Sequence, residues 1–114
     1  MKKLIIIVFF FSFSNLYSSE IKLKKIADGL KKPWSISFID QENVLITEKS
    51  GKLLNLNLID KKISEIKHNL SILEDGQGGL LDVLYYKEQV YISYSENRGN
   101  WKTSTSVAKG KFNK

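Results

Sequence analysis

Cysteine is absent from this sequence, and its absence removes several chemistries at once. Without a thiol, the chain forms no disulfide, carries no cysteine nucleophile and offers no Cys-ligated metal site. Histidine is almost as scarce, because His68 is the single one among 114 residues. With no second histidine to pair as a metal ligand, we expect His68 to be a surface or loop residue rather than a catalyst or a ligand.

A cluster of basic residues is also missing, although the chain is basic. Lysine and arginine total 18 against 12 acidic residues, which gives a formal net charge of +6. The basic residues are spread along the whole chain in runs no longer than two. A nucleic-acid-binding surface gathers them into a patch interleaved with aromatic residues. We therefore predict a solvated, lysine-rich surface and no nucleic-acid partner.

Only one long apolar run occurs, and it lies at the N-terminus. Residues 4–13 are apolar except for Ser12, follow two lysines and lead into a polar segment that ends in two serines. This order of charged, apolar and small residues predicts a secretory signal peptide over residues 1–19. The run is shorter than the roughly 20 residues of a membrane-spanning helix. We expect residues 20–114 in the periplasm or outside the cell, without a membrane span; an uncleaved anchor is the alternative.

After the signal peptide, the sequence shows no helical period. Apolar and polar residues instead alternate, as in the run from Trp34 to Phe38, and this period of two is typical of half-buried strands. Residues 21–27 form the first predicted strand, and their three lysines indicate that it lies at the edge of a sheet. The predicted strands cover residues 21–27, 34–38, 43–48, 54–58, 63–67, a segment that begins at Leu80, 89–95 and 103–112.

The strand pattern repeats after 46 residues. The matching pairs are Trp34 and Leu80, Phe38 and Leu84, Glu42 and Glu88, Val44 and Val90, and Ile46 and Ile92. A period of about 40–50 residues with about four short strands per unit predicts the blades of a β-propeller. Two blades cannot close a propeller, which needs at least about four. We therefore expect an all-β fold, the N-terminal part of a longer protein or a truncated reading frame; a compact eight-stranded sandwich or barrel is the alternative.

The second unit begins with a glycine-rich stretch, GQGGLLDV, at residues 76–83. Glycine serves where the backbone adopts unusual angles or comes close to a ligand. Three glycines around one amide suggest a loop that presents Gln77. A tight turn before a strand is the alternative interpretation.

Five blocks of this sequence, taken together, resemble the glucose/sorbosone dehydrogenase family. The resemblance covers nearly all of residues 26–112 and about the first third of a family member. The blocks are GL…PWSI.F at residues 29–38, VLITE..GKL at 44–53, GQGGLLDV at 76–83, VYISY at 90–94 and TSVAKG at 105–110.

The resemblance implies a six-bladed β-propeller that binds pyrroloquinoline quinone (PQQ) near its axis, with calcium helping to hold and polarise this cofactor. It also implies the reaction. An aldose gives up its C1 hydroxyl proton to a histidine and its C1 hydride to the quinone, and so becomes a lactone. The electrons then leave to an external acceptor.

Residue by residue, Gln77 matches the family glutamine beside the reactive quinone carbonyl and the sugar, and we assign Gly76, Gly78 and Gly79 to cofactor binding with it. A neutral amide suits this place, because it donates to a quinone oxygen and accepts from a hydroxyl. The family's catalytic histidine and calcium ligands belong to later blades. We therefore expect no catalytic and no metal-binding residue in this chain, and no activity from the chain alone.

Other side chains are expected to be structural. Asp82 is interpreted as a partner of nearby backbone groups, Trp34 as a core residue, and Glu48 and Asp75 as loop or surface carboxylates. The alternative function is a non-catalytic secreted propeller, or a small β-domain, that binds a glycan or a protein.

Overall fold

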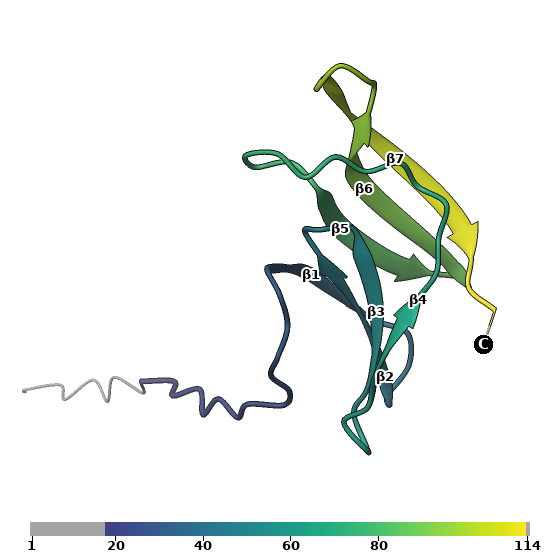
Figure 1. Ribbon diagram of the computed structural model, residues 1–114. Helices are drawn as coiled ribbons and strands as arrows, with labels where there is room; N and C mark the ends of the chain where they lie inside the picture. The colour runs from purple at the N-terminus through teal and green to yellow at the C-terminus, as the bar shows by residue number, and fades with distance from the viewer. Residues whose placement is uncertain (1–17, 114) are drawn as a thin grey trace, which may run out of the picture.

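The computed structural model describes residues 18–113, and these residues form two antiparallel β-sheets and no helix (Figure 1). The signal-peptide prediction for residues 1–19 falls almost entirely outside the described residues. Since residues 18–113 contain no long apolar helix, none of them could cross a membrane as a helix.

Each sheet is a meander in which every strand pairs with the next strand of the sequence. No strand crosses from one sheet to the other, so each sheet has the form of one propeller blade. The first sheet contains β1 (Pro33–Phe38), β2 (Asn43–Glu48), β3 (Lys52–Asn57) and β4 (Ile63–Ile66). The second sheet contains β5 (Leu80–Tyr86), β6 (Gln89–Asn97) and β7 (Thr103–Lys111).

Side chains of Asp and Asn build the turns of the first sheet. Asp40 Oδ1 accepts hydrogen bonds from the backbone N–H groups of Glu42 and Asn43, both at 2.8 Å, and so turns the chain from β1 into β2. After β3, Asn57 Oδ1 accepts the N–H of Ile59 at 2.8 Å in the same manner. Short acceptor side chains that bond their own backbone two or three residues later are the usual cause of such turns.

The main core lies between the two sheets. Leu45 and Leu80 are fully buried there, one from each sheet. Strand register explains the arrangement, because alternate residues of β2 and of β6 point to the facing sheet. The buried members of this core are Leu45, Leu53, Leu80, Val83, Val90, Ile92 and Tyr94.

The 46-residue period is confirmed by the strand positions. Val44 and Ile46 lie in β2, the second strand of the first sheet, while Val90 and Ile92 lie in β6, the second strand of the second sheet. The second pair packs against the preceding sheet, whereas the first pair belongs to an apolar cluster on the far face of the first sheet. Successive blades stack in this way, with equivalent faces turned in the same direction. The second sheet has three strands among residues 18–113, one fewer than the pattern predicted.

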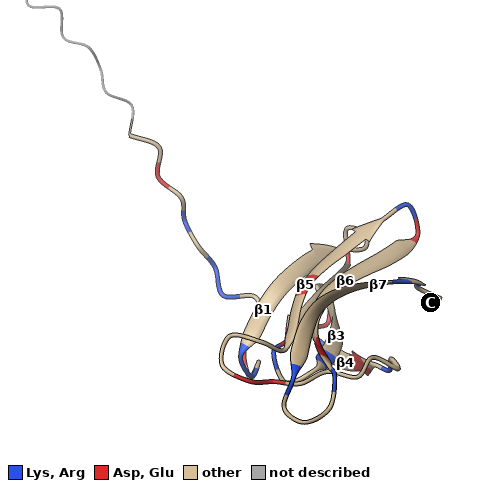
Figure 2. Cartoon of the chain, turned by 90° about the horizontal axis from the view of Figure 1, so that it is seen from above, with Lys and Arg blue, Asp and Glu red and all other residues tan. Residues whose placement is uncertain are grey.

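The predicted strand 21–27 is wrong. The segment pairs with none of the described strands and runs away from both sheets (Figure 2). Ile21 and Leu23 are 81% and 92% exposed. Alternation alone makes a segment suited to a sheet, but a strand forms only where a neighbour satisfies its backbone groups. The remaining predicted strands are confirmed, with ends that shift by at most two residues.

Thr47 ties three strands together at the centre of the molecule. Its side chain is fully buried in β2. The hydroxyl accepts the backbone N–H of Ser35 in β1 at 3.1 Å and donates to the carbonyl oxygen of Leu81 in β5 at 2.6 Å. One buried hydroxyl thus joins the first strands of both sheets.

Replacing Thr47 by valine is expected to lower the free energy of unfolding by about 2 kcal/mol, because the isosteric side chain leaves a donor on half-buried Ser35 and an acceptor on half-buried Leu81 unpaired. Urea unfolding followed by tryptophan fluorescence measures the loss. The control is Thr103→Val on the exposed start of β7, which we expect to change stability by less than about 0.5 kcal/mol. Equal losses in the two variants would contradict the linking role.

Candidate functional site

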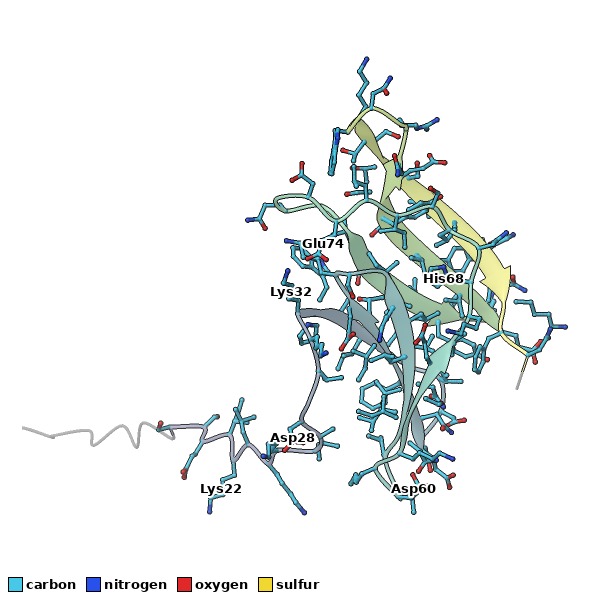
Figure 3. The ribbon with its side chains drawn as sticks, viewed as in Figure 1. Lys22, Asp28, Lys32, Asp60, His68 and Glu74 are labelled. Carbon is cyan, nitrogen blue, oxygen red and sulfur yellow. The ribbon has the colours of Figure 1, made fainter. Side chains whose placement is uncertain are left out.

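Three backbone segments meet at the end of the sheets where β1 and β5 begin. These are residues 31–33, the β2–β3 turn at residues 49–51 and the loop at residues 74–79. Lys32 and Glu74 form an ion pair of 2.6 Å between the first and last of them, and the two residues are labelled close together in Figure 3. This end of the molecule therefore carries the glycine-rich stretch that the sequence singled out.

Two of the glycines in the 74–79 loop are required for close packing within the protein. Gly79 has φ +149°, and a Cβ atom placed there would lie 2.2 Å from the carbonyl oxygen of Lys49. A Cβ atom on Gly78 would lie 2.6 Å from Oγ of Ser95. These glycines let the loop lie directly on the first sheet and on β6.

Gln77 lies at the exposed tip of this loop, next to Gly76. Gly76 has φ +52°, and a Cβ atom there would meet nothing within 4 Å, so the space beside the tip is open. Within the described residues the Gln77 amide makes no hydrogen bond, which leaves its donor and acceptor groups available. The segment is thus a turn before a strand, while the role of Gln77 towards a ligand stays a prediction.

Lys49 holds the 74–79 loop through a hydrogen bond to its backbone, and the sequence analysis did not identify this residue. Its ammonium group donates to the carbonyl oxygen of Gly76 and lies 5.9 Å from the centre of the Trp34 ring. Trp34 is 48% exposed, so its assignment to the core was wrong. The ring lies at the start of β1, where a register irregularity between Pro33 and Ser35 breaks the regular alternation. The only sequence signal for Lys49 is its position in the turn before Gly51.

Glu48 is buried, which corrects its assignment as a loop or surface carboxylate. The residue is 4% exposed at the end of β2, and its carboxylate accepts the backbone N–H of Lys31 at 2.6 Å. A charged hydrogen bond of this kind offsets part of the cost of burial. Glu48 thereby fixes the segment that leads into β1. Asp75 lies exposed in the 74–79 loop, as the sequence indicated.

Asp82 has the structural role expected of it. Its Oδ1 atom accepts hydrogen bonds from the Ser35 hydroxyl and from the backbone N–H of Val83, the latter at 2.9 Å. The Ser37 hydroxyl similarly accepts the N–H of Tyr85 at 2.8 Å. Short polar side chains therefore hold β1 against β5, the two strands that begin beside the Gln77 loop.

His68 is an exposed loop residue with a structural role. Its Nε2 atom lies 2.7 Å from the carbonyl oxygen of Gly51, and its Nδ1 atom accepts the N–H of Leu70 at 3.2 Å. These bonds require the neutral tautomer with the proton on Nε2. Across residues 18–113, no three His, Asp or Glu side chains gather in a way that could hold a metal ion.

Among residues 18–113, the carboxyl group whose pKa is clearly displaced is that of Glu65, away from the Gln77 loop. A hydrogen bond from Lys67 lowers the pKa of Glu65, and the positive charges of Lys67 and Lys52 lower it further. Glu65 belongs to β4 at the outer edge of the first sheet. The group is solvated, so its shift marks a surface ion pair rather than a catalytic acid.

Comparisons of sequence and structure show which known proteins the chain is similar to. The sequence model of a family described as Glucose / Sorbosone dehydrogenase matches residues 30–114, which include β1 to β7 and the Gln77 loop. Aldose sugar dehydrogenase YliI of Escherichia coli (strain K12) is 28% identical over 98 residues, which cover 81% of this chain and 26% of that protein. The chain therefore spans about a quarter of the length of this relative.

Solved structures show the same fold. A glucose dehydrogenase is 36% identical, with a TM-score of 0.71 over 77% of this chain and 29% of that one. The PQQ-bound form of an aldose sugar dehydrogenase from Streptomyces coelicolor is 16% identical, with a TM-score of 0.66 over 76% of this chain and 26% of that one, and shows likeness of fold alone. With these likenesses, the prediction of about two propeller blades that do not close into a ring is confirmed.

Proposed function

The chain belongs to the glucose/sorbosone dehydrogenase family, and on that basis we propose that it is the N-terminal portion of a PQQ-dependent sugar dehydrogenase. The proposed reaction oxidises an aldose at C1 to its lactone. Support comes from a family match that includes the whole Gln77 loop, and from the names of the relatives, which are aldose sugar and glucose dehydrogenases. The partners would be an aldose and an external electron acceptor.

One observation carries the proposal. The Gln77 amide stands free at the tip of a loop whose base is fixed, and the space beside the tip is open. The fixed base keeps the amide in one region of the surface, where a ligand would replace water at its donor and acceptor groups.

The residues at this end of the molecule fit one wall of a PQQ site. When bound, PQQ supplies the quinone that takes up the hydride from the sugar. Gln77 would donate its amide N–H to a quinone or sugar oxygen and would accept a hydroxyl hydrogen at its carbonyl oxygen. Gly76 leaves room for a ring beside the loop, while Gly78 and Gly79 hold the loop in place.

The catalytic base and the calcium ligands of the proposed enzyme are not assigned to this chain. His68 is engaged by Gly51 and Leu70, and the described residues hold no metal-binding cluster. A histidine base and the calcium site would come from other parts of the whole enzyme. The chain alone is proposed to be inactive.

The compartment is part of the same proposal. Residues 1–19 have the charged, apolar and small segments of a signal peptide. Residues 20–114, with no cysteine to oxidise, would then work in the periplasm or outside the cell. Expression of the full chain, followed by N-terminal sequencing of the exported protein, tests the cleavage after Ser18 or Ser19.

A chimera tests the enzymatic proposal. Residues 30–114 replace the aligned segment of E. coli aldose sugar dehydrogenase, which supplies the rest of a family member. The chimera, loaded with PQQ and Ca²⁺, is expected to oxidise an aldose to its lactone and to pass the electrons to a dye, which is thereby reduced. The 114-residue chain alone is expected to reduce none.

Two controls give the assay its meaning. Sorbitol, which has no C1 hemiacetal, should not support dye reduction, and omission of PQQ should abolish the reaction with every sugar. A chimera that folds and binds PQQ but oxidises no aldose would sink the proposal and favour the non-catalytic glycan- or protein-binding alternative.

A further inference from the structure

A hollow lies beside the hairpin that joins β6 to β7. This hairpin and the Gln77 loop lie at the same end of the second sheet, because β5 and β6 are antiparallel (Figure 1). Its volume is about 370 Å³, and its lining consists of Leu73, Asn97, Gly99, Asn100 and Trp101. Small-molecule sites commonly occupy about 300–1,000 Å³. The Trp101 side chain is 83% exposed, so packing within residues 18–113 gains little from this large ring.

The backbone of the hairpin makes the choice of tryptophan unusual. The N–H of Lys102 donates to the carbonyl oxygen of Gly99 at 2.9 Å, and the two residues between them, Asn100 and Trp101, have φ values of 49° and 59°. Positive φ at both central positions defines a turn that favours Asn followed by Gly. A bulky residue in this conformation is rare.

The β5–β6 hairpin at the opposite end of the sheet provides a comparison. Its central residues, Lys87 and Glu88, also have positive φ, but both are charged side chains in solvent. At residue 101, an apolar ring takes the place of such a side chain. Within residues 18–113, neither packing nor turn preference explains Trp101, whereas a ligand stacked on the ring would.

The lining selects the chemical class of that ligand. None of its five residues carries a charge, and the neighbouring Arg98 is engaged at 2.9 Å by both Glu96 and Ser104. Asn97 uses its Oδ1 atom to accept the N–H of Gly99 at 2.9 Å, which leaves its NH₂ group as a donor. A flat aromatic face between amide groups suits a neutral, polyhydroxylated ring, with apolar carbons on one face and hydroxyls at its edge.

This hollow is connected to the Gln77 loop through the backbone. Leu73 forms part of the lining, and its N–H donates to the carbonyl oxygen of Ser95 at 3.0 Å, which fixes the segment on β6. Because Leu73 precedes Gln77 by four residues, their Cα atoms lie at most about 15 Å apart. A chain of a few sugar units can bridge that distance.

We infer that the Trp101 hollow is a second sugar-binding subsite, so that the preferred substrate is a neutral oligosaccharide. Its reducing-end unit lies beside Gln77, and a unit further along the chain stacks on Trp101. This inference rests on the proposed function for the reaction at the reducing end, but binding at Trp101 itself requires neither PQQ nor oxidation.

The experiment uses the full chain labelled with ¹⁵N and the methyl glycosides of maltotriose and cellotriose, which cannot be oxidised at C1. One of these probes at tens of millimolar is expected to shift the indole N–H signal of Trp101, with a dissociation constant of millimolar order. The backbone N–H signals of Lys87 and Glu88, at the opposite end of the sheet, should stay in place and serve as the control within the molecule. Trp101→Ala is expected to weaken binding at least about tenfold, which corresponds to about 1.4 kcal/mol.

The control variant is Tyr86→Ala, which removes another exposed aromatic ring at the opposite end of the sheet and should leave affinity unchanged. The inference is overturned if neither probe shifts the Trp101 signal, or if Trp101→Ala binds as tightly as the original chain. Failure of the proposed function gives a result that is distinguishable from failure of this inference. In that case Trp101 responds to the probes while the chimera oxidises no aldose.

Discussion

Replacing Gly79 by alanine is expected to lower the free energy of unfolding by about 3–5 kcal/mol, because strain and a steric clash act together. The new Cβ atom would lie 2.2 Å from the carbonyl oxygen of Lys49. The loop cannot easily move away, since this oxygen accepts the N–H of Leu80 at 3.0 Å and Gly79 accepts the N–H of Ser95 at 2.8 Å. Relief of the clash therefore breaks hydrogen bonds to both sheets.

Gly76→Ala is the matched control, three residues earlier in the same loop. Gly76 also has positive φ, at +52°, but its Cβ position is open. We expect this variant to lose only about 1 kcal/mol, from the left-handed backbone alone. Urea unfolding with tryptophan fluorescence compares the two variants. Similar midpoints would show that the loop does not rest on Lys49 in the way described.

Replacing Gln77 by alanine in the chimera is expected to lower kcat/KM for an aldose roughly 100-fold, which is the effect of removing one donor aimed at developing negative charge. Stability should change little, because the side chain is exposed and makes no hydrogen bond within residues 18–113. Steady-state dye reduction measures the rate, and urea unfolding checks the fold.

Gln41→Ala is the control for this activity prediction. Gln41 is another exposed glutamine, in the β1–β2 turn and away from the Gln77 loop. Its loss should leave kcat/KM within about twofold. If the two glutamine variants are equally active, Gln77 has no part in the reaction and the site assignment fails.

The strands were predictable from the sequence because their cause is local. Alternation around Val90 reflects burial on one face, and the unbroken apolar run from Val44 to Ile46 reflects burial on both faces. Asp40 and Asn57 mark turns by bonding their own backbone. The 46-residue repeat then indicated how the strands divide into sheets. Local pattern was insufficient for residues 21–27, where the alternation is present but no described strand offers its edge.

The errors at the candidate site have a different cause, because contacts between distant residues decide them. The buried carboxylate of Glu48 accepts a hydrogen bond from the backbone N–H of Lys31, 17 residues earlier. No periodicity in the sequence predicts that bond. Lys49 reaches the Gln77 loop only after both sheets have stacked. Trp101 lies in a segment that the sequence marked as a loop, and its surroundings became visible only in the folded hairpin.

The central claim is that Gln77 forms one wall of the PQQ site. A crystal structure of the PQQ-bound chimera tests it most directly, through the distance from the Gln77 amide to the nearest quinone oxygen. The account predicts a hydrogen bond of about 2.7–3.2 Å, with Gly76 beside the cofactor ring. A bound PQQ that leaves the Gln77 side chain directed into solvent would contradict it.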